Sequence, residues 1–392
     1  MKKVLLYYNF SYPLGGGDFL PLTFASWLQS RCELTLAVDS ESGFRRALEA
    51  FGVPLDTGRI KVAPLLPNGL DFRSHNAFWS FVRSVRLKRL AAKADICISA
   101  ANVTDFGRPA HHFINMLSGV DHAFAAHGGI VMPRASLKRF IADGVVRPLA
   151  GMRSKRRIFA DERERFYSNS KYVHDRLTAF YGSFHDTIFY PPTTYEPDVS
   201  VEAPPRDPMR VICLGRINPQ KRVADVIDIV ERARARSGKD IRLTVAGPCG
   251  NGEYATQIRL AAGERPWITL VDGVFGRAKD DLLRSGRFAV HARRDEEFGI
   301  AVTEYLKAGL IPVVPDEGGS REVVGRPELS YSTNDEAASK LARLVTDNAF
   351  AETMLGHCRS RAAAFSRGEY ERREADLLEK ILSEPSRQPA RE

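Results

Sequence analysis

Residues 295–319 read DEEFGIAVTEYLKAGLIPVVPDEGG, and their acids and glycines have the types and spacing to bind a phosphorylated sugar. Glu296 and Glu304 stand eight positions apart, on either side of Phe298-Gly299. Carboxylates accept hydrogen bonds from sugar hydroxyls, and free amides at a helix N-terminus bind phosphate. We therefore expect a nucleotide sugar here, with its rings on the two acids and its pyrophosphate near the amides of Phe298, Gly299 and Ile300.

A second segment supplies the cations that a diphosphate needs. The apolar run from Val211 to Leu214 ends in Gly215-Arg216, and a Pro-containing turn then leads through Lys221 to a helical pattern. A strand followed by such a turn and a helix is the layout of a phosphate loop, and arginine and lysine bind phosphate oxygens well. The pattern predicts that Arg216 and Lys221 neutralise the pyrophosphate.

The two segments together carry a resemblance to a known family. The order GR-x-x-P-Q-K, with Arg216 and Lys221, then E-x-F-G-x-x-x-x-E, with Glu296 and Glu304, resembles the retaining family-4 glycosyltransferases, or glycosyl transferases group 1. The resemblance covers most of the chain and is most specific in its C-terminal half. It implies an α/β chain of the GT-B fold, with two Rossmann-like, doubly wound parallel-sheet domains that face a central cleft.

The resemblance also implies roles for the site residues. Glu304 is expected to hold the ribose hydroxyls and Glu296 those of the transferred sugar, while Arg216 and Lys221 stabilise the leaving diphosphate. The main chain near Gly273-Val274 is expected to contact the base. Retention of anomeric configuration follows from the resemblance alone. We expect no cofactor and no metal, because the cations take the metal's place and the chain has no Asp-x-Asp sequence.

Two N-terminal features join this set of candidate residues. Gly15-Gly16-Gly17 lies between an apolar strand and a helical pattern, where its amides could approach a phosphate. We list Gly15 and Gly16 with the donor-binding residues because they match the family's N-terminal glycine loop. His127 follows an apolar run and precedes two glycines, a position where doubly wound sheets bind ligands. The resemblance implies that His127 is catalytic, on the acceptor side, together with Glu296, Arg216 and Lys221.

Alternating apolar runs and helical patterns predict parallel sheets in both halves of the chain. A Pro-rich stretch after Tyr190 marks a connection between domains. We expect an acceptor-side domain over 1–190, a donor-binding domain over 191–365, a helix over 366–382 that crosses back, and a flexible tail over 383–392. The expected strands are Lys3–Tyr8, Cys32–Val38, Asp95–Ala100, His122–Ala126, Arg210–Leu214, Ile241–Ala246, Ile268–Val271, Phe288–His291 and Ile311–Val314.

Composition is that of an ordinary globular chain. Its 392 residues suffice for two cores, with 44% hydrophobic and 27% charged residues. The five scattered cysteines read as small core residues in a reducing compartment. The apolar start is too short for a signal peptide, and no apolar run is long enough to span a membrane. We therefore expect a cytoplasmic protein.

Positive charge is concentrated in the first half of the chain. Residues 1–190 carry +10 and residues 191–392 carry −1. The excess lies in residues 76–93, a basic segment bearing Trp79 and Phe81, and in residues 134–157. Such a segment fits an anionic membrane surface, or it is a surface helix with its apolar side in the core. Nucleic acid is not expected as a partner, because the interleaved aromatic motifs of RNA-binding modules are absent.

Alternatives remain at this point. The chain could be another GT-B enzyme such as an epimerase, hydrolase or phosphorylase, or a sugar-nucleotide binder without transferase activity. We expect the acceptor to be a lipid-linked or other glycan precursor, whereas the sugar, the base and the linkage are not encoded in the motifs. Arg293 and Arg294 are expected to be a solvated pair beside the site.

Overall fold

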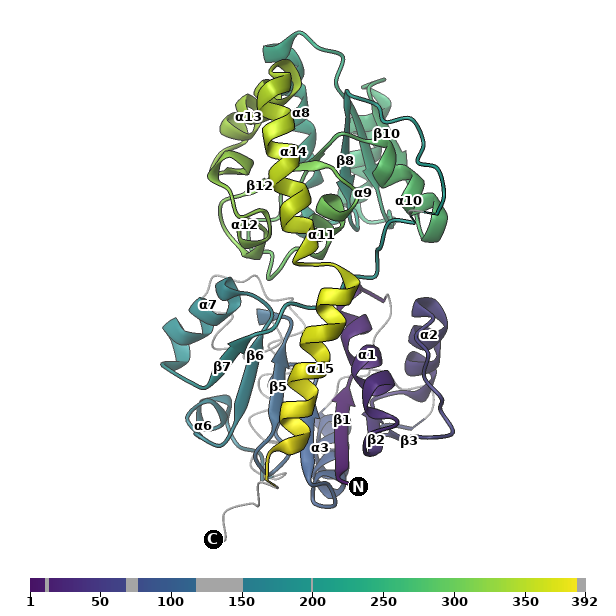
Figure 1. Cartoon of the computed structure of the whole chain (residues 1–392), viewed down its shortest axis with the longest axis vertical. Coiled ribbons are helices and arrows are strands. Elements are labelled where there is room, and N and C mark those ends of the chain that lie inside the picture. Colours follow the sequence, from purple (N-terminus) through teal and green to yellow (C-terminus); the bar gives the residue numbers. More distant parts are fainter. Residues whose placement is uncertain (11–13, 68–76, 118–150, 199, 386–392) are drawn as a thin grey trace. The chain divides into compact units, whose positions relative to one another are not determined.

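The computed structural model describes residues 1–10, 14–67, 77–117, 151–198 and 200–385. These divide into two compact units (Figure 1). Unit 1 comprises Met1–Thr194 together with Tyr370–Glu392, and unit 2 comprises Tyr195–Glu369. Each unit has its own parallel sheet with helices packed against it. This is the α/β organisation that the alternating pattern predicted.

Within its described residues, unit 1 is built on seven parallel strands in the order β3-β2-β1-β4-β5-β6-β7. Strands β1 and β4 are mostly apolar and buried, as expected of a sheet covered on both faces. The strands are β1 (Lys3–Tyr8), β2 (Glu33–Val38), β3 (Lys61–Pro64), β4 (Ile96–Ser99), β5 (His111–Ile114), β6 (Arg165–Ser168) and β7 (Asp186–Ile188).

Two of the longer helices of unit 1 begin at a serine that caps them. Ser40 and Ser170 accept hydrogen bonds from the first turns of α2 and α7, which satisfies amides that would otherwise lack a partner. The apolar side of α3 enters the core through Leu87 and Ala91. The helices are α1 (Phe19–Leu28), α2 (Glu41–Phe51), α3 (Ala77–Ala91), α6 (Lys155–Phe159) and α7 (Lys171–Tyr181), with a 3-10 turn, η1, at Gly16–Asp18.

Unit 2 has, in its described part, six parallel strands in the order β10-β9-β8-β11-β12-β13. The strands are β8 (Arg210–Leu214), β9 (Arg242–Ala246), β10 (Ile268–Val271), β11 (Phe288–Val290), β12 (Ile311–Pro315) and β13 (Ser330–Tyr331). The helices are α8 (Val223–Ser237), α9 (Glu253–Gly263), α10 (Gly276–Ser285), α11 (Ile300–Lys307), α12 (Gly319–Val324), α13 (Asn334–Thr346) and α14 (Asn348–Ala363), with 3-10 turns η3 (Pro219–Lys221) and η4 (Pro327–Leu329).

The last helix, α15 (Arg367–Ser383), starts at the end of unit 2 and packs into unit 1. Tyr370, Leu378 and Ile381 are buried in the same core cluster as α1 and β1. The hydroxyl of Tyr370 lies 2.7 Å from that of Thr23 in α1, and Figure 1 shows α15 in yellow beside α1. The core of unit 1 is therefore completed by the last part of the chain.

The apolar runs located β1, β2 and β4 of unit 1 and β8 to β12 of unit 2 within a residue or two of their observed ends. The expected strand His122–Ala126 lies outside the described residues. The short strands β3, β5, β6, β7 and β13 were not expected. In β5, His111 and His112 are buried and pair with Tyr167 and Glu164, so polar residues there concealed a central strand.

Candidate active site

The predicted donor-site residues of unit 2 follow the carboxyl ends of its strands, the edge at which parallel sheets bind ligands. Gly215 and Arg216 follow β8, and Gly273 and Val274 stand just beyond β10. Glu296 lies in the loop between β11 and α11, while Glu304 lies within α11. The fold thus brings residues far apart in the sequence to one edge of one sheet.

The loop that carries Glu296 is held by backbone packing that requires glycine. Gly299 begins α11 at φ +101°, and a Cβ there would lie 2.7 Å from the Ser320 hydroxyl. A Cβ on Gly319 would lie 2.4 Å from the Glu297 carbonyl oxygen. The Gly319 amide also donates a 2.7 Å hydrogen bond to the carbonyl of Glu296. The Gly318-Gly319 turn therefore fixes the backbone of the acidic loop.

Glu296 is 8% exposed and lies close to three basic side chains, one from the turn before α8 and two from its own loop. Its Oε2 lies 2.5 Å from Lys221 Nζ and 3.2 Å from His291 Nε2, and its Oε1 lies 3.4 Å from Arg293 Nη1. Burial opposes ionisation, but Lys221, His291 and Arg293 outweigh it and hold the pKa of the Glu296 carboxyl well below its usual range. Glu296 is thus a buried carboxylate at neutral pH.

Arg293 is not the solvated residue that we expected. Its side chain is 16% exposed and forms ion pairs with Asp295 at 3.1 Å and Glu297 at 2.9 Å in addition to Glu296. Burial raises the pKa of the Glu297 carboxyl despite the neighbouring Arg293. Arg294 is half-buried and donates to the Ser332 carbonyl. The expectation failed because three acids lie within four residues of Arg293 and fold around its guanidinium.

Glu304 is 3% exposed and pairs with Lys279 of α10. Lys279 Nζ lies 2.7 Å from Glu304 Oε1 and 5.8 Å from the centre of the Tyr195 ring. Tyr195 is in turn fixed by a 2.8 Å hydrogen bond to Asp280. In the described part of the chain, the second carboxylate oxygen of Glu304 accepts no hydrogen bond. A buried carboxylate with one free oxygen can accept hydrogen bonds from the hydroxyl groups of a ligand.

Arg216 is exposed and forms no hydrogen bond or ion pair with the described residues, so its guanidinium is available to an anion. The amides of Gly299 and Ile300 likewise find no acceptor within the described ranges, as expected for a helix N-terminus. Phe298 differs, since its buried side chain packs against Phe365 with ring centres 5.9 Å apart. Its side chain is thus a core contact, and its role at the site is confined to the main chain.

The loop after β10 has a backbone that suits contact with a flat ligand. Gly273 is exposed at φ +63°, and Asp272 accepts a 3.0 Å hydrogen bond from the Cys249 amide in the neighbouring loop. Phe275 is 71% exposed, and its ring lies next to Gly273. Contact of Gly273 and Val274 with a base remains a prediction.

The N-terminal candidates are less fully described. Gly15 precedes η1, and its amide donates a 2.6 Å hydrogen bond to the carboxylate of Asp18. This amide is therefore occupied in the absence of a ligand, whereas Gly16 is half-buried within the same turn. His127 lies outside the described residues, as does most of the basic segment 134–157.

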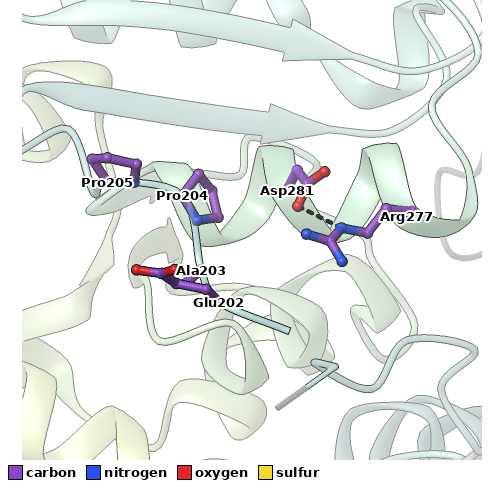
Figure 2. Close-up of a pocket in the computed structure, with 6 residues that line it drawn as sticks. All are labelled: Glu202, Ala203, Pro204, Pro205, Arg277 and Asp281. Atoms are coloured by element: carbon purple, nitrogen blue, oxygen red, sulfur yellow. Dashed lines mark hydrogen bonds and ion pairs between the residues drawn. The ribbon is translucent and has the colours of Figure 1, made fainter. Parts of the chain in front are cut away.

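A shallow hollow elsewhere on unit 2 contains none of these residues. Figure 2 shows its lining of Glu202, Ala203, Pro204, Pro205, Arg277 and Asp281. Arg277 and Asp281 pair with each other at 2.7 Å. The described residues also hold no group of three or more His, Cys, Asp or Glu side chains arranged to hold a metal.

Two contacts of the acidic pair were missed by sequence reasoning. His291 stands at the end of a predicted strand, so the argument that selected His127 applies equally to it. Lys279 is a different case, because it meets Glu304 from another helix, 25 positions away in the chain. Neither its type nor its spacing distinguishes it from a surface lysine.

Comparisons with known proteins find relatives of unit 2 by sequence and of the whole chain by fold. The family model of glycosyl transferases group 1 matches residues 196–359. A GDP-Man:Man(3)GlcNAc(2)-PP-Dol alpha-1,2-mannosyltransferase of Caenorhabditis elegans is 23% identical over 168 residues, which are 39% of this chain and 36% of that protein. The matched segment thus spans about a third of the length of this relative.

Solved structures share the fold at low sequence identity. The Anabaena protein HepE, in complex with UDP and glucose, matches 98% of this chain and all of its own chain with a TM-score of 0.67 at 14% identity. WaaG, a glycosyltransferase involved in lipopolysaccharide biosynthesis, matches 96% of this chain and 99% of its own with a TM-score of 0.68 at 14% identity. The chain therefore has the GT-B fold, and its residues 196–359 match the model of the glycosyl transferases group 1 family.

Proposed function

We propose that the protein is a glycosyltransferase that moves a sugar from a nucleoside-diphosphate sugar to a glycan acceptor, with retention of anomeric configuration. The observation that carries this proposal is the buried acidic pair, in which Glu296 and Glu304 stand at the carboxyl edge of the unit 2 sheet with Lys221 and Lys279 against them. Two buried carboxylates with cations suit a ligand that has both hydroxyls and phosphates.

The charges of the site fit the chemistry of the transfer. The bond from the sugar to the diphosphate breaks, and negative charge grows on the leaving group. Arg216, free among the described residues, and Lys221 would stabilise that charge, and preorganised groups of this kind dominate many enzymes' rate enhancements. Glu296 would hold hydroxyls of the transferred sugar and Glu304 those of the ribose. His127 keeps its proposed place on the acceptor side.

Two nucleotide classes, GDP-sugars and UDP-sugars, are candidates for the donor. The similar mannosyltransferase of Caenorhabditis elegans is named for GDP-Man, whereas HepE was solved with UDP and glucose. We propose GDP-mannose first, because the mannosyltransferase is 23% identical over its 168 matched residues whereas HepE is 14% identical over its match, and UDP-glucose second. A thermal-shift panel of both sugar nucleotides decides, since a ligand of the folded state raises the melting temperature with its affinity.

We propose a lipid-linked glycan precursor as the acceptor. The C. elegans relative is named for the acceptor Man(3)GlcNAc(2)-PP-Dol, and the excess positive charge of residues 1–190 suits an anionic partner. In the part of the chain that the structure describes, no helix has the length and apolarity to cross a membrane. We propose that the protein reaches this acceptor by docking on a membrane surface, at the cytoplasmic face.

The described parts of the two basic segments adjoin each other in unit 1. Lys88 in α3 donates a 2.7 Å hydrogen bond to the carbonyl of Gly151, and the Ser84 hydroxyl lies 3.4 Å from the sulfur of Met152. Lys88 also pairs with Asp105, so it contributes to the fold. Phe78, 61% exposed, packs edge-on against Trp79 at the start of α3. The adjoining segments would present one basic surface that carries an exposed aromatic side chain.

Vesicle sedimentation tests this docking surface. We expect the protein to bind vesicles of anionic lipid, not to bind vesicles of neutral lipid, and to bind more weakly as the salt concentration rises. Each lysine or arginine near an anionic leaflet contributes about 1 kcal/mol to the binding free energy, and salt screens this attraction. The triple change Arg86→Gln, Arg89→Gln and Lys93→Gln, at exposed positions of α3 and just after it, should remove binding. The matched control of equal charge is Lys239→Gln, Arg326→Gln and Arg343→Gln on unit 2. Unchanged vesicle binding by the α3 variant would show that the docking surface lies elsewhere. A wild-type protein that does not bind vesicles would refute membrane docking.

The alternative functions are separated by product analysis. A transferase gives a new glycan and a nucleoside diphosphate with a lipid-linked acceptor, and little hydrolysis without it. A hydrolase releases free sugar without acceptor, an epimerase changes the sugar while it stays on the nucleotide, and a binder shifts the melting temperature without turnover. Absence of both binding and turnover across UDP- and GDP-sugars would refute the proposed function.

A further inference from the structure

The groups around Glu296 differ in how firmly they are held. Arg293 is anchored by ion pairs to Asp295 and Glu297 as well as to Glu296. His291 is 3% exposed, its amide donates to Val313, and its carbonyl accepts from the hydroxyl of Tyr331. The guanidinium of Arg293 is therefore held independently of Glu296, and the main chain that carries the buried His291 ring is fixed by its own hydrogen bonds.

Lys221 is held differently. Within the described residues, the ammonium of Lys221 pairs with Glu296 alone, at 2.5 Å. Its aliphatic stem crosses Gly215, where a Cβ would lie 3.6 Å from Lys221 Cε. Gly215 has φ +146° and directly precedes Arg216 in the predicted phosphate loop. The lysine stem thus lies across the turn where a diphosphate is proposed to bind, with its charged end on the proposed sugar-binding acid.

We infer that Lys221 is shared between the two subsites and exchanges partners when the donor binds. In the empty protein it neutralises Glu296. In the complex Lys221 pairs with the diphosphate and frees an oxygen of Glu296. That oxygen then accepts a hydrogen bond from a hydroxyl of the transferred sugar. This inference rests on the proposed donor site and adds an order to it, since the sugar subsite forms only when a diphosphate is present.

The exchange is physically reasonable because Glu296 does not lose all compensation when Lys221 leaves. Arg293 and His291 stay within 3.4 Å of its carboxylate. Removal of every partner from a buried carboxylate would be costly, but here the guanidinium of Arg293 remains as a charged partner. The Lys221 ammonium that leaves Glu296 can pair instead with the charged oxygens of the two phosphates. A free monosaccharide brings no phosphate, so it should bind poorly.

Isothermal titration with UDP and GDP tests the exchange. Glu296→Gln removes the resting partner of Lys221, so the better-binding nucleotide should bind about tenfold more tightly than to wild type. Glu304→Gln should weaken binding, because the proposed ribose contact is lost. Glu297→Gln is the matched control, since it changes an equally buried neighbouring acid that does not pair with Lys221. Thermal melting establishes that each variant is folded.

A double-mutant cycle separates the exchange from simple repulsion between Glu296 and phosphate. In a Lys221→Met background, Glu296→Gln should change nucleotide affinity by no more than about twofold, because the shared cation is already gone. A gain that persists in that background, or no gain in the native background, overturns the exchange while leaving the donor site intact. Wild type that binds neither UDP nor GDP overturns both the exchange and the proposed function.

Discussion

The buried carboxyl of Glu374 predicts a pH-dependent stability of unit 1. Glu374 lies in α15 with 4% exposure, and its Oε1 accepts a 2.8 Å hydrogen bond from Tyr370. Burial raises the pKa of Glu374 to about 7, against the hydrogen bonds from Thr23 and Tyr370 that lower it. The folded state therefore keeps a proton that the unfolded chain releases near its ordinary value of 4.5.

The sign and size of the effect follow from proton linkage. Below about pH 4.5 both states are protonated and Glu374 contributes nothing. As pH rises from there to about 7, the unfolded state binds fewer protons, so the free energy of unfolding falls. Each unit of pKa shift corresponds to 1.36 kcal/mol, so the loss totals roughly 3 kcal/mol above pH 7. Glu374→Gln keeps a neutral side chain at all pH values and removes this loss.

The assay is urea unfolding of the full chain at pH 5 and pH 8, followed by tryptophan fluorescence. Of the three tryptophans, Trp27 and Trp79 lie in unit 1, so a Trp267→Phe background reports on unit 1 alone. In this background Glu374→Gln should be more stable than its parent by up to roughly 3 kcal/mol at pH 8, and by much less at pH 5. The control, Glu379→Gln, changes an exposed position of the same helix. An equal effect of Glu374→Gln at both pH values would refute the reasoning.

Three further changes test the site. Glu304→Ala should lower kcat/KM by the equivalent of roughly 2–4 kcal/mol, because bound hydroxyls lose a charged partner, and near-normal transfer would remove the ribose role. Arg216→Lys should lower kcat without moving the melting temperature, since a point charge cannot reproduce a guanidinium fork at a residue that holds no other contact in the described structure; an unchanged kcat would contradict this. Gly319→Ala should destabilise unit 2 by about 1–3 kcal/mol and impair turnover, because its Cβ meets the Glu297 carbonyl at 2.4 Å. Its control, Gly356→Ala in open space on α14, should be neutral or stabilising.

The sequence located the parts of the fold that rest on local patterns. Apolar runs such as Val211–Leu214 predicted the central strands because a parallel strand covered on both faces must be apolar throughout. Strand β5 was missed because His111 and His112 are buried there against Tyr167 and Glu164. Their partners lie more than 50 residues farther along the chain. No local pattern reports a polar residue that is satisfied by so distant a partner.

The same distinction holds within the site. Glu296 and Glu304 could be selected because their spacing and the glycines near them are local features. Their partners Lys221 and Lys279 approach from 75 and 25 positions away. Lys221 belongs to the predicted phosphate loop and could be selected by that motif, whereas Lys279 belongs to no motif. The partly buried position of Arg293 could not be predicted, because the charge of a residue does not reveal whether neighbouring acids fold around its guanidinium.

The path of α15 sets the order in which the protein can be completed during synthesis. Unit 2 is one continuous stretch, Tyr195–Glu369, and it can fold as soon as that stretch has left the ribosome. Unit 1 begins first but lacks Tyr370, Leu378 and Ile381 of its core until the far end of the chain has been translated. The nascent N-terminal part must therefore wait with an open apolar surface beside α1, where α15 will pack. A chain that stops before α15 would lose the unit made first and keep the unit made second.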